Sequence, residues 1–323
     1  MSELMKTQEN LREVARKLLA GGEVSLVIGY APGSEVSRVV PAFIRKEEEV
    51  DRLIWNPLCV NNLVKYLLDY RNEPGKVAVV VKGCDSRAII RLLQDNQITR
   101  EKVIILGIPC PGLIKSDLVA ANLDPGTSIT AATVNERGFS LQTGKGSFTF
   151  TRDEALLDKC RNCEHHTPVI ADFMLGEEIP PSVPEDPFIG VKTLEQLPVK
   201  ERSAYWDKQF SRCLRCYACR NVCPACTCRE CVFDQAEPRW VAKANNLSEN
   251  TAFHLIRAFH VAGRCVDCGE CERVCPVNIP LSLLNRKILK DIKDLFNVPT
   301  PGSSLEELSP LGTFNNSDPD EFM

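Results

Sequence analysis

Apolar residues near the start of the chain follow helical spacing and then form a short continuous run. The helical spacing covers residues 11–20 and stops at Gly21-Gly22, where we expect a helix to end. The run that follows, at 24–28, is typical of a buried strand. The chain therefore opens with an α/β pattern.

Two further apolar runs, at 76–82 and 103–106, are separated by a helical pattern at 87–94, for which Asp85 is the expected N-cap. Such runs are typical of strands buried on both faces of a parallel sheet, so this segment predicts a βαβ unit. A cysteine follows each strand, at Cys84 and Cys110. Because parallel strands joined by a right-handed crossover end at one edge of the sheet, we expect both thiols at the edge where α/β folds place ligands.

The pattern changes twice after this unit. Residues 127–151 alternate between Thr, Val and Phe, which predicts one or two antiparallel hairpins. Prolines and acidic residues then fill 176–198, which is typical of an extended connection between domains. Beyond it the periodicity predicts helices at 204–215, at 249–262 with Ser248 as cap, and at 281–296.

The predicted fold is an α/β N-terminal domain, with a parallel βαβ core and a β-hairpin insertion, joined to a mainly α-helical domain. We place the α/β domain at 1–175, a proline-rich linker at 176–200 and the helical domain at 201–297. Residues 298–323 are rich in Pro, Ser, Asn and Asp and predict a flexible acidic tail.

Composition and charge limit the classes of protein to which this chain can belong. The 323 residues are 44% hydrophobic and 25% charged, which suits a soluble chain with two or three cored domains. A net charge of -4 provides no basic field for nucleic acid. Neither a secretory signal nor a membrane-spanning apolar run is present, so we expect a cytoplasmic protein. In a reducing cytosol, its sixteen cysteines are expected to be metal ligands or reactive thiols.

Two cysteine runs share the spacing C-x2-C-x2-C-x3-C-P of two-cluster ferredoxins. In that arrangement the fourth thiolate of each run binds the cluster of the other run. The expected [4Fe-4S] ligand sets are Cys213, Cys216, Cys219 and Cys275 for the first cluster, and Cys265, Cys268, Cys271 and Cys223 for the second. Zinc is the alternative metal, but a zinc site needs only two C-x2-C knuckles and does not require this order of four cysteines and a proline.

The other eight cysteines are less regular. Two strand ends and a C-x2-C knuckle supply Cys84, Cys110, Cys160 and Cys163, which we expect to hold a third cluster. The alternative is that the first two are small buried side chains and the knuckle is a redox or zinc site. A candidate fourth set, whose spacing matches no known cluster motif, consists of Cys59, Cys226, Cys228 and Cys231.

Several charged or titratable residues accompany these cysteines. Lys82 and Arg87 flank Cys84, where they could offset cluster charge, contact a phosphate of FAD or be ordinary charges at element ends. The pair His165-His166 could replace a thiolate or carry a proton, or belong to a solvated loop. Residues expected to stabilise reduced clusters near the two ferredoxin runs are Arg215, Arg220, Arg264 and Arg273.

Three motifs together resemble a known family. The segments Gly83-Cys84-Asp85-Ser86-Arg87-Ala88, 107–112 and 159–163 resemble the beta-subunit family of coenzyme F420 (deazaflavin) hydrogenases and formate dehydrogenases, over roughly residues 20–175. The resemblance implies a domain that binds FAD and a [4Fe-4S] cluster and passes electrons between clusters and a deazaflavin. It also implies that Cys110, Cys160 and Cys163, and next Cys84, are cluster ligands.

The chain departs from that family in two respects. Its ferredoxin segment follows the α/β domain, whereas the family often carries it in front, and no G-x-G-x-x-G follows a strand. The 41 residues between Cys223 and Cys265 leave room for a helix. This half resembles the helical dicluster modules of heterodisulfide reductase and succinate dehydrogenase iron-sulfur subunits.

Together these features predict an iron-sulfur electron-transfer subunit of an anaerobic oxidoreductase complex, such as a formate dehydrogenase, hydrogenase or heterodisulfide-reductase-like complex. Its partners would be other subunits of that complex, and no residue is assigned a catalytic role. One alternative is a flavoenzyme subunit that uses FAD to reduce a soluble deazaflavin or nicotinamide carrier. Another is a scaffold in which the clusters are structural.

Overall fold

The computed structural model describes residues 3–35, 37–124, 127–135, 137–182, 185–307, 311–313, 316 and 318. The chain divides into two compact units, Met1–Pro184 and Glu185–Met323, here called the N-terminal and C-terminal units. The tail predicted at 298–323 lies partly outside the described residues.

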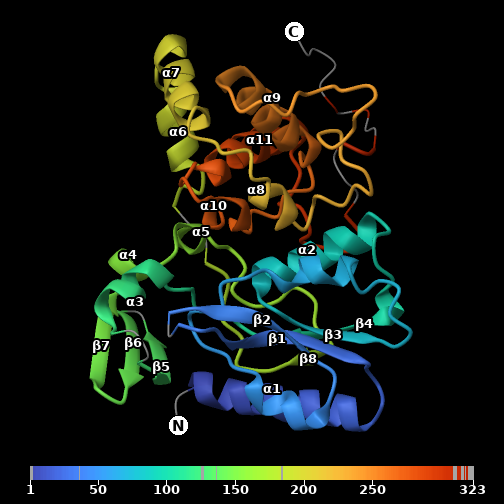
Figure 1. Cartoon of the computed structure of the whole chain (residues 1–323), viewed down its shortest axis with the longest axis vertical. Coiled ribbons are helices and arrows are strands. Elements are labelled where there is room, and N and C mark those ends of the chain that lie inside the picture. The colour runs from blue at the N-terminus through green and yellow to red at the C-terminus, as the bar shows by residue number, and fades with distance from the viewer. Residues whose placement is uncertain are drawn as a thin grey trace. The chain divides into compact units, whose positions relative to one another are not determined.

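The N-terminal unit is built on a five-stranded sheet with the order β2-β1-β3-β4-β8 (Figure 1). Strands β1, β3, β4 and β8 run parallel, whereas β2 pairs antiparallel with β1 at one edge. Every residue of β3 and β4 is buried, which agrees with their continuous apolar runs. The strands are β1 (Leu26–Pro32), β2 (Val39–Ile44), β3 (Val77–Val81), β4 (Val103–Gly107) and β8 (Phe173–Met174).

Helices α1 (Glu3–Ala20) and α2 (Gly83–Gln94) lie on opposite sides of this sheet (Figure 1). Helix α2 begins four residues earlier than predicted, and the assignment of Asp85 as its N-cap was wrong. Lys82 is the N-cap, and Asp85 lies in the first turn, where its carboxylate accepts the Lys82 N–H at 3.2 Å. A side chain of the first turn thus accepts the backbone N–H of the cap residue, and the helix includes Gly83 and Cys84. Short 3-10 helices complete this part: η1 (Glu47–Arg52), η2 (Leu63–Leu68) and η3 (Arg100–Lys102).

A separate three-stranded antiparallel sheet, β5-β6-β7, follows the parallel core. The alternating segment at 127–151 supplies all three strands. They are β5 (Ile129–Asn135), β6 (Gly138–Thr143) and β7 (Gly146–Thr151). Short helices precede and follow them: α3 (Ser116–Asn122), α4 (Arg152–Ala155) and α5 (Asp158–Arg161).

The C-terminal unit is helical throughout its regular structure. The connection predicted to be extended at 176–198 contains a helix, α6, because its prolines flank residues 189–195 rather than interrupt them. Helix α9 is capped by Asn246, which accepts the Glu249 N–H at 3.0 Å, and not by Ser248 as predicted. The helices are α6 (Ile189–Glu195), α7 (Val199–Phe210), α8 (Ala218–Asn221), α9 (Leu247–His260), α10 (Glu270–Arg273) and α11 (Leu281–Phe296).

The core of this unit joins aromatic side chains to cysteines. Phe210, Phe233 and Phe253 are almost fully buried, and three thiols of the ferredoxin runs belong to the same cluster of buried side chains. Those thiols are Cys213, Cys219 and Cys271. Among the helices of the described ranges, none combines the length and apolar character that a membrane span requires.

Candidate metal centres

The two cysteine runs of the C-terminal unit adopt the same backbone conformation. Arg215 and Asp267, at equivalent positions of the two runs, both have φ of 53°. Tyr217 and Gly269, two residues later, have φ of 59° and 65°. Left-handed backbone is uncommon for residues other than glycine, so its occurrence at matching positions marks a functional constraint on the loops. The short helices α8 and α10 follow these turns.

The thiols of the first predicted set lie close enough to interact electrostatically. The Cys219 thiol interacts electrostatically with those of Cys213, Cys216 and Cys275. Cys275, the fourth cysteine of the predicted set, belongs to the other run. Burial raises the pKa of the Cys213 thiol and raises that of Cys219 to about 11. Cys219 therefore lies within electrostatic range of the other three thiols of the predicted first set.

Thiols of the second predicted set also interact across the two runs. Cys265 interacts with Cys223, Cys268 and Cys271, and Cys271 also interacts with Cys223. Burial raises the pKa of Cys265 far above that of a free thiol and raises the pKa of Cys271 to about 12. Thiols this buried become good ligands only when a metal replaces their protons.

Several hydrogen-bond donors point at these sulfur atoms. The Arg215 N–H donates to Cys213 Sγ at 3.3 Å, and the Ile279 N–H donates to Cys275 Sγ at 3.3 Å. Asn285 Nδ2 on α11 donates to Cys271 Sγ at 3.5 Å. Donors of this kind stabilise negative charge on sulfur. Asn285 was missed from the sequence, because its contact depends on how α11 packs.

The basic residues near the two runs differ in how their charge is balanced. Arg220 pairs with Asp234 at 2.8 Å and Arg273 pairs with Glu270 at 2.7 Å, so carboxylates offset two of the predicted charges. Arg264 donates to the Thr227 hydroxyl at 3.1 Å.

Two of the basic residues of this unit are buried. Arg215 donates to the Glu249 carbonyl at 2.6 Å and lies over the Phe253 ring at 5.0 Å. Arg257 on α9 is also buried, and it was missed from the sequence. Its spacing on the apolar face of the predicted helix at 249–262 was the available signal.

The third predicted set occupies one edge of the N-terminal sheet. Cys84 lies in the first turn of α2 after β3, and Cys110 follows β4. Cys110 interacts electrostatically with Cys160 and Cys163, and Cys84 interacts with Cys163. Burial raises the pKa of Cys84, Cys110 and Cys160. Cys110 therefore lies within electrostatic range of Cys160 and Cys163, and Cys84 within range of Cys163, beside the carboxyl ends of β3 and β4.

Glycine at position 83 permits this arrangement. A Cβ placed on Gly83 would lie 1.8 Å from the His165 carbonyl oxygen, so the loop that follows Cys163 touches the bare backbone of α2. His166 holds the same loop to the end of β4. Its carbonyl accepts the Cys110 N–H at 2.8 Å, and its ring atoms Nδ1 and Nε2 lie 3.0 Å from the Cys110 carbonyl and the Ser182 hydroxyl. His166 is thus a buried residue that links this loop to the end of β4, and it does not belong to a solvated loop.

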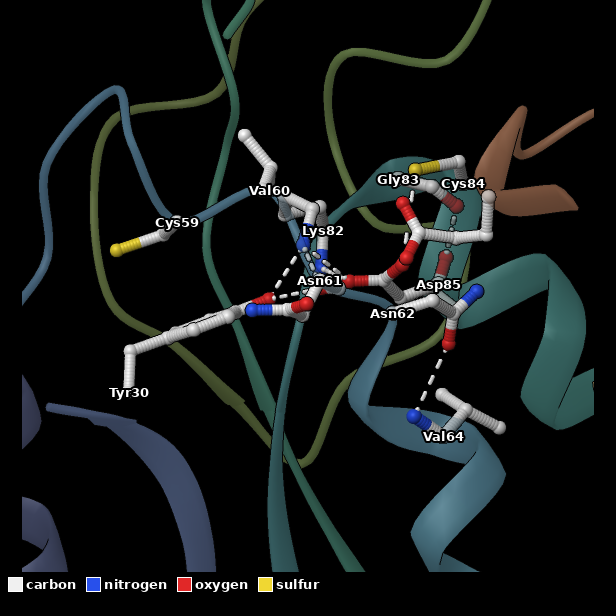
Figure 2. A network of polar contacts seen from close by, with 12 residues as sticks. Tyr30, Cys59, Val60, Asn61, Asn62, Val64, Lys82, Gly83, Cys84 and Asp85 are labelled. Carbon is white, nitrogen blue, oxygen red and sulfur yellow. Dashed lines mark hydrogen bonds and ion pairs between the residues drawn. The ribbon is translucent and has the colours of Figure 1, made fainter. Parts of the chain in front are cut away.

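A buried polar network lies beneath Cys84 (Figure 2). Lys82 and Asp85, each 1% exposed, form an ion pair at 2.7 Å. The ammonium also donates to the Tyr30 hydroxyl and to the Asn61 carbonyl, the latter at 2.8 Å. The Cys84 thiol lies 3.6 Å from the other carboxylate oxygen of Asp85. Burial opposes the charge on Lys82, but Asp85, Tyr30 and Cys84 together outweigh burial and hold the Lys82 pKa well above its usual value.

This network changes the interpretation of Lys82. Its positive charge lowers the pKa of Cys84, Cys110 and Cys160, against the effect of burial. The ammonium is enclosed by its three partners, so it has no free face for the FAD phosphate suggested from the sequence. Arg87, the other suggested FAD contact, is also buried. Lys82 is placed instead as a counter-charge beneath the thiols.

The members of the candidate fourth set have different surroundings. Cys59 is fully buried in the N-terminal unit, where its sulfur accepts the Asn56 N–H at 3.4 Å and burial raises its pKa to about 12. Cys226, Cys228 and Cys231 belong to the loop after α8 in the C-terminal unit, and Cys228 is exposed. Across the described ranges, no group of three or more His, Cys, Asp or Glu side chains is arranged to hold a single metal ion.

The donor chemistry of the three predicted sets is uniform. Each set offers thiols alone, and soft thiolate ligands suit iron-sulfur clusters. Cationic side chains and hydrogen-bond donors approach the sulfur atoms, as an anionic cluster requires. The residues present therefore fit [4Fe-4S] clusters.

Comparison with known proteins agrees with this donor set. Residues 209–279 match the 4Fe-4S dicluster domain, and residues 75–197 match the family described as the C terminus of the coenzyme F420 hydrogenase/dehydrogenase beta subunit. The F420-dependent formate dehydrogenase subunit beta of Methanocaldococcus jannaschii is 25% identical, with 87% of this chain and 89% of that protein covered. The F420-dependent formate dehydrogenase 1 subunit beta of Methanococcus maripaludis is 24% identical, with 84% of each covered.

Among solved structures, a chain of the F420-reducing [NiFe] hydrogenase complex from Methanosarcina barkeri is 17% identical with a TM-score of 0.41. The match covers 51% of this chain and 64% of that chain, which is less than two thirds of its length. The two family matches, by contrast, each fall on a segment that carries predicted cluster ligands. The chain therefore combines a segment of the coenzyme F420 hydrogenase/dehydrogenase beta-subunit family with a 4Fe-4S dicluster domain.

Proposed function

We propose that this chain is an iron-sulfur electron-transfer subunit of a coenzyme F420-dependent formate dehydrogenase or a related anaerobic oxidoreductase complex. The observation that carries the proposal is that thiols of the two runs in the C-terminal unit interact across the runs, Cys219 with Cys275 and Cys265 with Cys223. The relatives named as beta subunits of F420-dependent formate dehydrogenases support the type of complex. Their description as subunits also supports partner subunits for this chain.

Three sets of residues would hold the clusters. The C-terminal unit supplies Cys213, Cys216, Cys219 and Cys275, and Cys265, Cys268, Cys271 and Cys223. The N-terminal unit supplies Cys84, Cys110, Cys160 and Cys163. When bound, [4Fe-4S] clusters supply one-electron redox chemistry over a wide range of potentials.

The remaining work falls to this chain's own residues, which hold the thiols in place and set their electrostatic environment. In the N-terminal unit, the enclosed Lys82 ammonium provides positive charge, and Gly83 lets the Cys160–Cys163 knuckle approach α2. In the C-terminal unit, backbone N–H groups and Asn285 donate hydrogen bonds to sulfur. Where the thiols are buried, as at Cys213, Cys219 and Cys271, water is excluded and each of these interactions is strengthened.

Metal analysis of anaerobically purified protein tests the proposal. We expect about twelve iron and about twelve acid-labile sulfide per chain, from three clusters of four. About eight would mean that the N-terminal thiols are empty, and about sixteen would add a cluster at Cys226, Cys228 and Cys231. Zinc in place of iron, or no paramagnetic signal after strong reduction, would refute the proposal.

Two serine substitutions distinguish a cysteine that binds a cluster from one that does not. Cys216→Ser should remove about four iron atoms, because Cys216 belongs to the first set. Cys59→Ser should leave the iron count unchanged, because the Cys59 thiol is fully buried against its own loop. Equal iron loss in both variants would contradict the ligand assignment.

A further inference from the structure

One buried cation of the C-terminal unit interacts with thiols of both predicted sets. Arg257 belongs to the buried face of α9, together with Phe253 and His254, and is 3% exposed. Its Nη2 donates to the Cys219 carbonyl at 3.0 Å. Helix α9 packs against α7 and α11, so the guanidinium is held inside the unit rather than at its surface.

The sulfur neighbours of Arg257 come from both sets. Its charge interacts with Cys219 of the first set and with Cys223 and Cys271 of the second, and also with Cys226. A single guanidinium therefore acts on both sets at once.

Among the described residues, no carboxylate forms an ion pair with Arg257. Arg220, Arg273 and Arg286 each pair with an acidic side chain at 2.7 or 2.8 Å. Within the described residues, Arg257 has no such ion pair, and its buried Nε has no hydrogen-bond partner. Burial alone lowers the pKa of Arg257, but the surrounding cysteines outweigh burial and hold it above its ordinary value.

An unbalanced buried cation is costly unless an anion lies beside it. The groups near Arg257 that can become anionic include thiols of both sets and Cys226. A [4Fe-4S] site with four thiolates carries net negative charge, and reduction adds one electron to it. A fixed positive charge in the interior favours the addition of that electron. Salt weakens the attraction between the guanidinium and the cluster site only a little, because Arg257 is buried.

We propose that Arg257 is a shared positioning charge that raises the reduction potentials of both cluster sites in the C-terminal unit. This inference rests on the proposed function. Each reduction takes one electron from an external reductant such as dithionite, and Arg257 keeps its protons and forms no bond in the step. Its role differs from that of Arg220 and Arg273, whose charges are offset by carboxylates.

The test compares reduction potentials in full-length, anaerobically loaded protein, followed by paramagnetic resonance during redox titration. In Arg257→Gln we expect the equilibrium constant for reduction to fall about tenfold at each of the two sites, which corresponds to about 59 mV per one-electron step. Arg257→Met should behave likewise, because it removes the charge, keeps a similar volume and introduces no polar atom of its own. Arg257→Lys, which keeps the charge, should retain both potentials within about threefold in the same constant.

Arg239→Gln is the charge-matched control, because Arg239 is exposed in the same unit and its field is screened by water. It should leave both potentials unchanged. A shift at one site only would overturn the shared role, and unchanged potentials in iron-replete Arg257→Gln or Arg257→Met would overturn the proposal altogether. So would a shift in Arg257→Lys as large as that in Arg257→Gln. In each of these cases the parent protein still contains reducible clusters, whereas failure of the proposed function would appear as missing iron in the parent itself.

Discussion

Replacing Gly83 with alanine tests how the N-terminal thiols are brought together. Gly83 is the first residue of α2, and the backbone of His165 lies against it. The alanine Cβ would sit 1.8 Å from the His165 carbonyl oxygen and 2.7 Å from the carbonyl carbon. Both contacts are with backbone, so no side-chain rotation relieves them.

The size of the effect follows from the geometry. Ordinary van der Waals contact begins near 3.4 Å, so the 165–167 loop must retreat by about 1.6 Å. That retreat would break the hydrogen bond from the Cys110 N–H to the His166 carbonyl, now 2.8 Å long. Overpacking costs about 1–3 kcal/mol and a lost hydrogen bond about 1 kcal/mol, which together make about 2–4 kcal/mol. Without the clash, alanine in a helix would instead stabilise by up to about 1 kcal/mol.

Iron analysis and denaturant unfolding of the full chain are the assays. We expect Gly83→Ala to lose the N-terminal cluster, with iron falling from about twelve to about eight while the dicluster signals remain. The midpoint of denaturation of the N-terminal unit, followed through Trp55, should fall. Gly144→Ala is the control, because its Cβ would meet nothing within 4 Å, and it should change neither quantity. A Gly83→Ala protein with full iron and equal or greater stability would refute the close approach.

Three further predictions concern buried groups. Asp85→Asn should destabilise the chain by about 3–5 kcal/mol in urea unfolding, because it leaves Lys82 charged and unpaired; an unchanged midpoint would contradict the buried pair. The pKa of His254 is lowered to about 3 by burial and by Arg257, so the folded chain binds one proton fewer below pH 6.5. Stability should therefore fall by about 1.4 kcal/mol per pH unit from pH 6.5 toward 3, and His254→Phe should remove that slope but not the stability above pH 6.5. Cys59→Ala should cost about 1 kcal/mol of unfolding free energy with no loss of iron, and iron loss would show that Cys59 is a ligand.

Much of the architecture could be predicted from local patterns. Continuous apolar runs identified β3 and β4, and the helical period identified α1 and α11. Helix starts were less predictable, because capping depends on which polar group reaches the first turn. Asp85 and Ser248 were plausible caps by residue type, yet Lys82 and Asn246 occupy the cap positions.

The predicted ligand sets differ in how far they depend on local sequence. The C-x2-C-x2-C-x3-C-P spacing predicts two crossed sets, because ligand loops of this kind are short and continuous. The N-terminal set depends on strands that become neighbours only in the sheet, so Cys84 and Cys110 could be related only through the expected parallel topology. By sequence, Lys82 was a candidate phosphate contact. In the structure its ammonium instead donates to Tyr30 and Asn61, which are distant in the sequence.

What the sequence determined by itself was the donor chemistry: how many thiols there are, how they are spaced within each run, and which apolar runs must be buried. These are properties of single segments, and period and spacing record them directly. Only the tertiary structure decided which charges are balanced, which polar atoms are left without partners and where backbone meets backbone. Arg257, Asn285 and Gly83 owe their roles to contacts between segments distant in the chain, and no local pattern encodes such contacts.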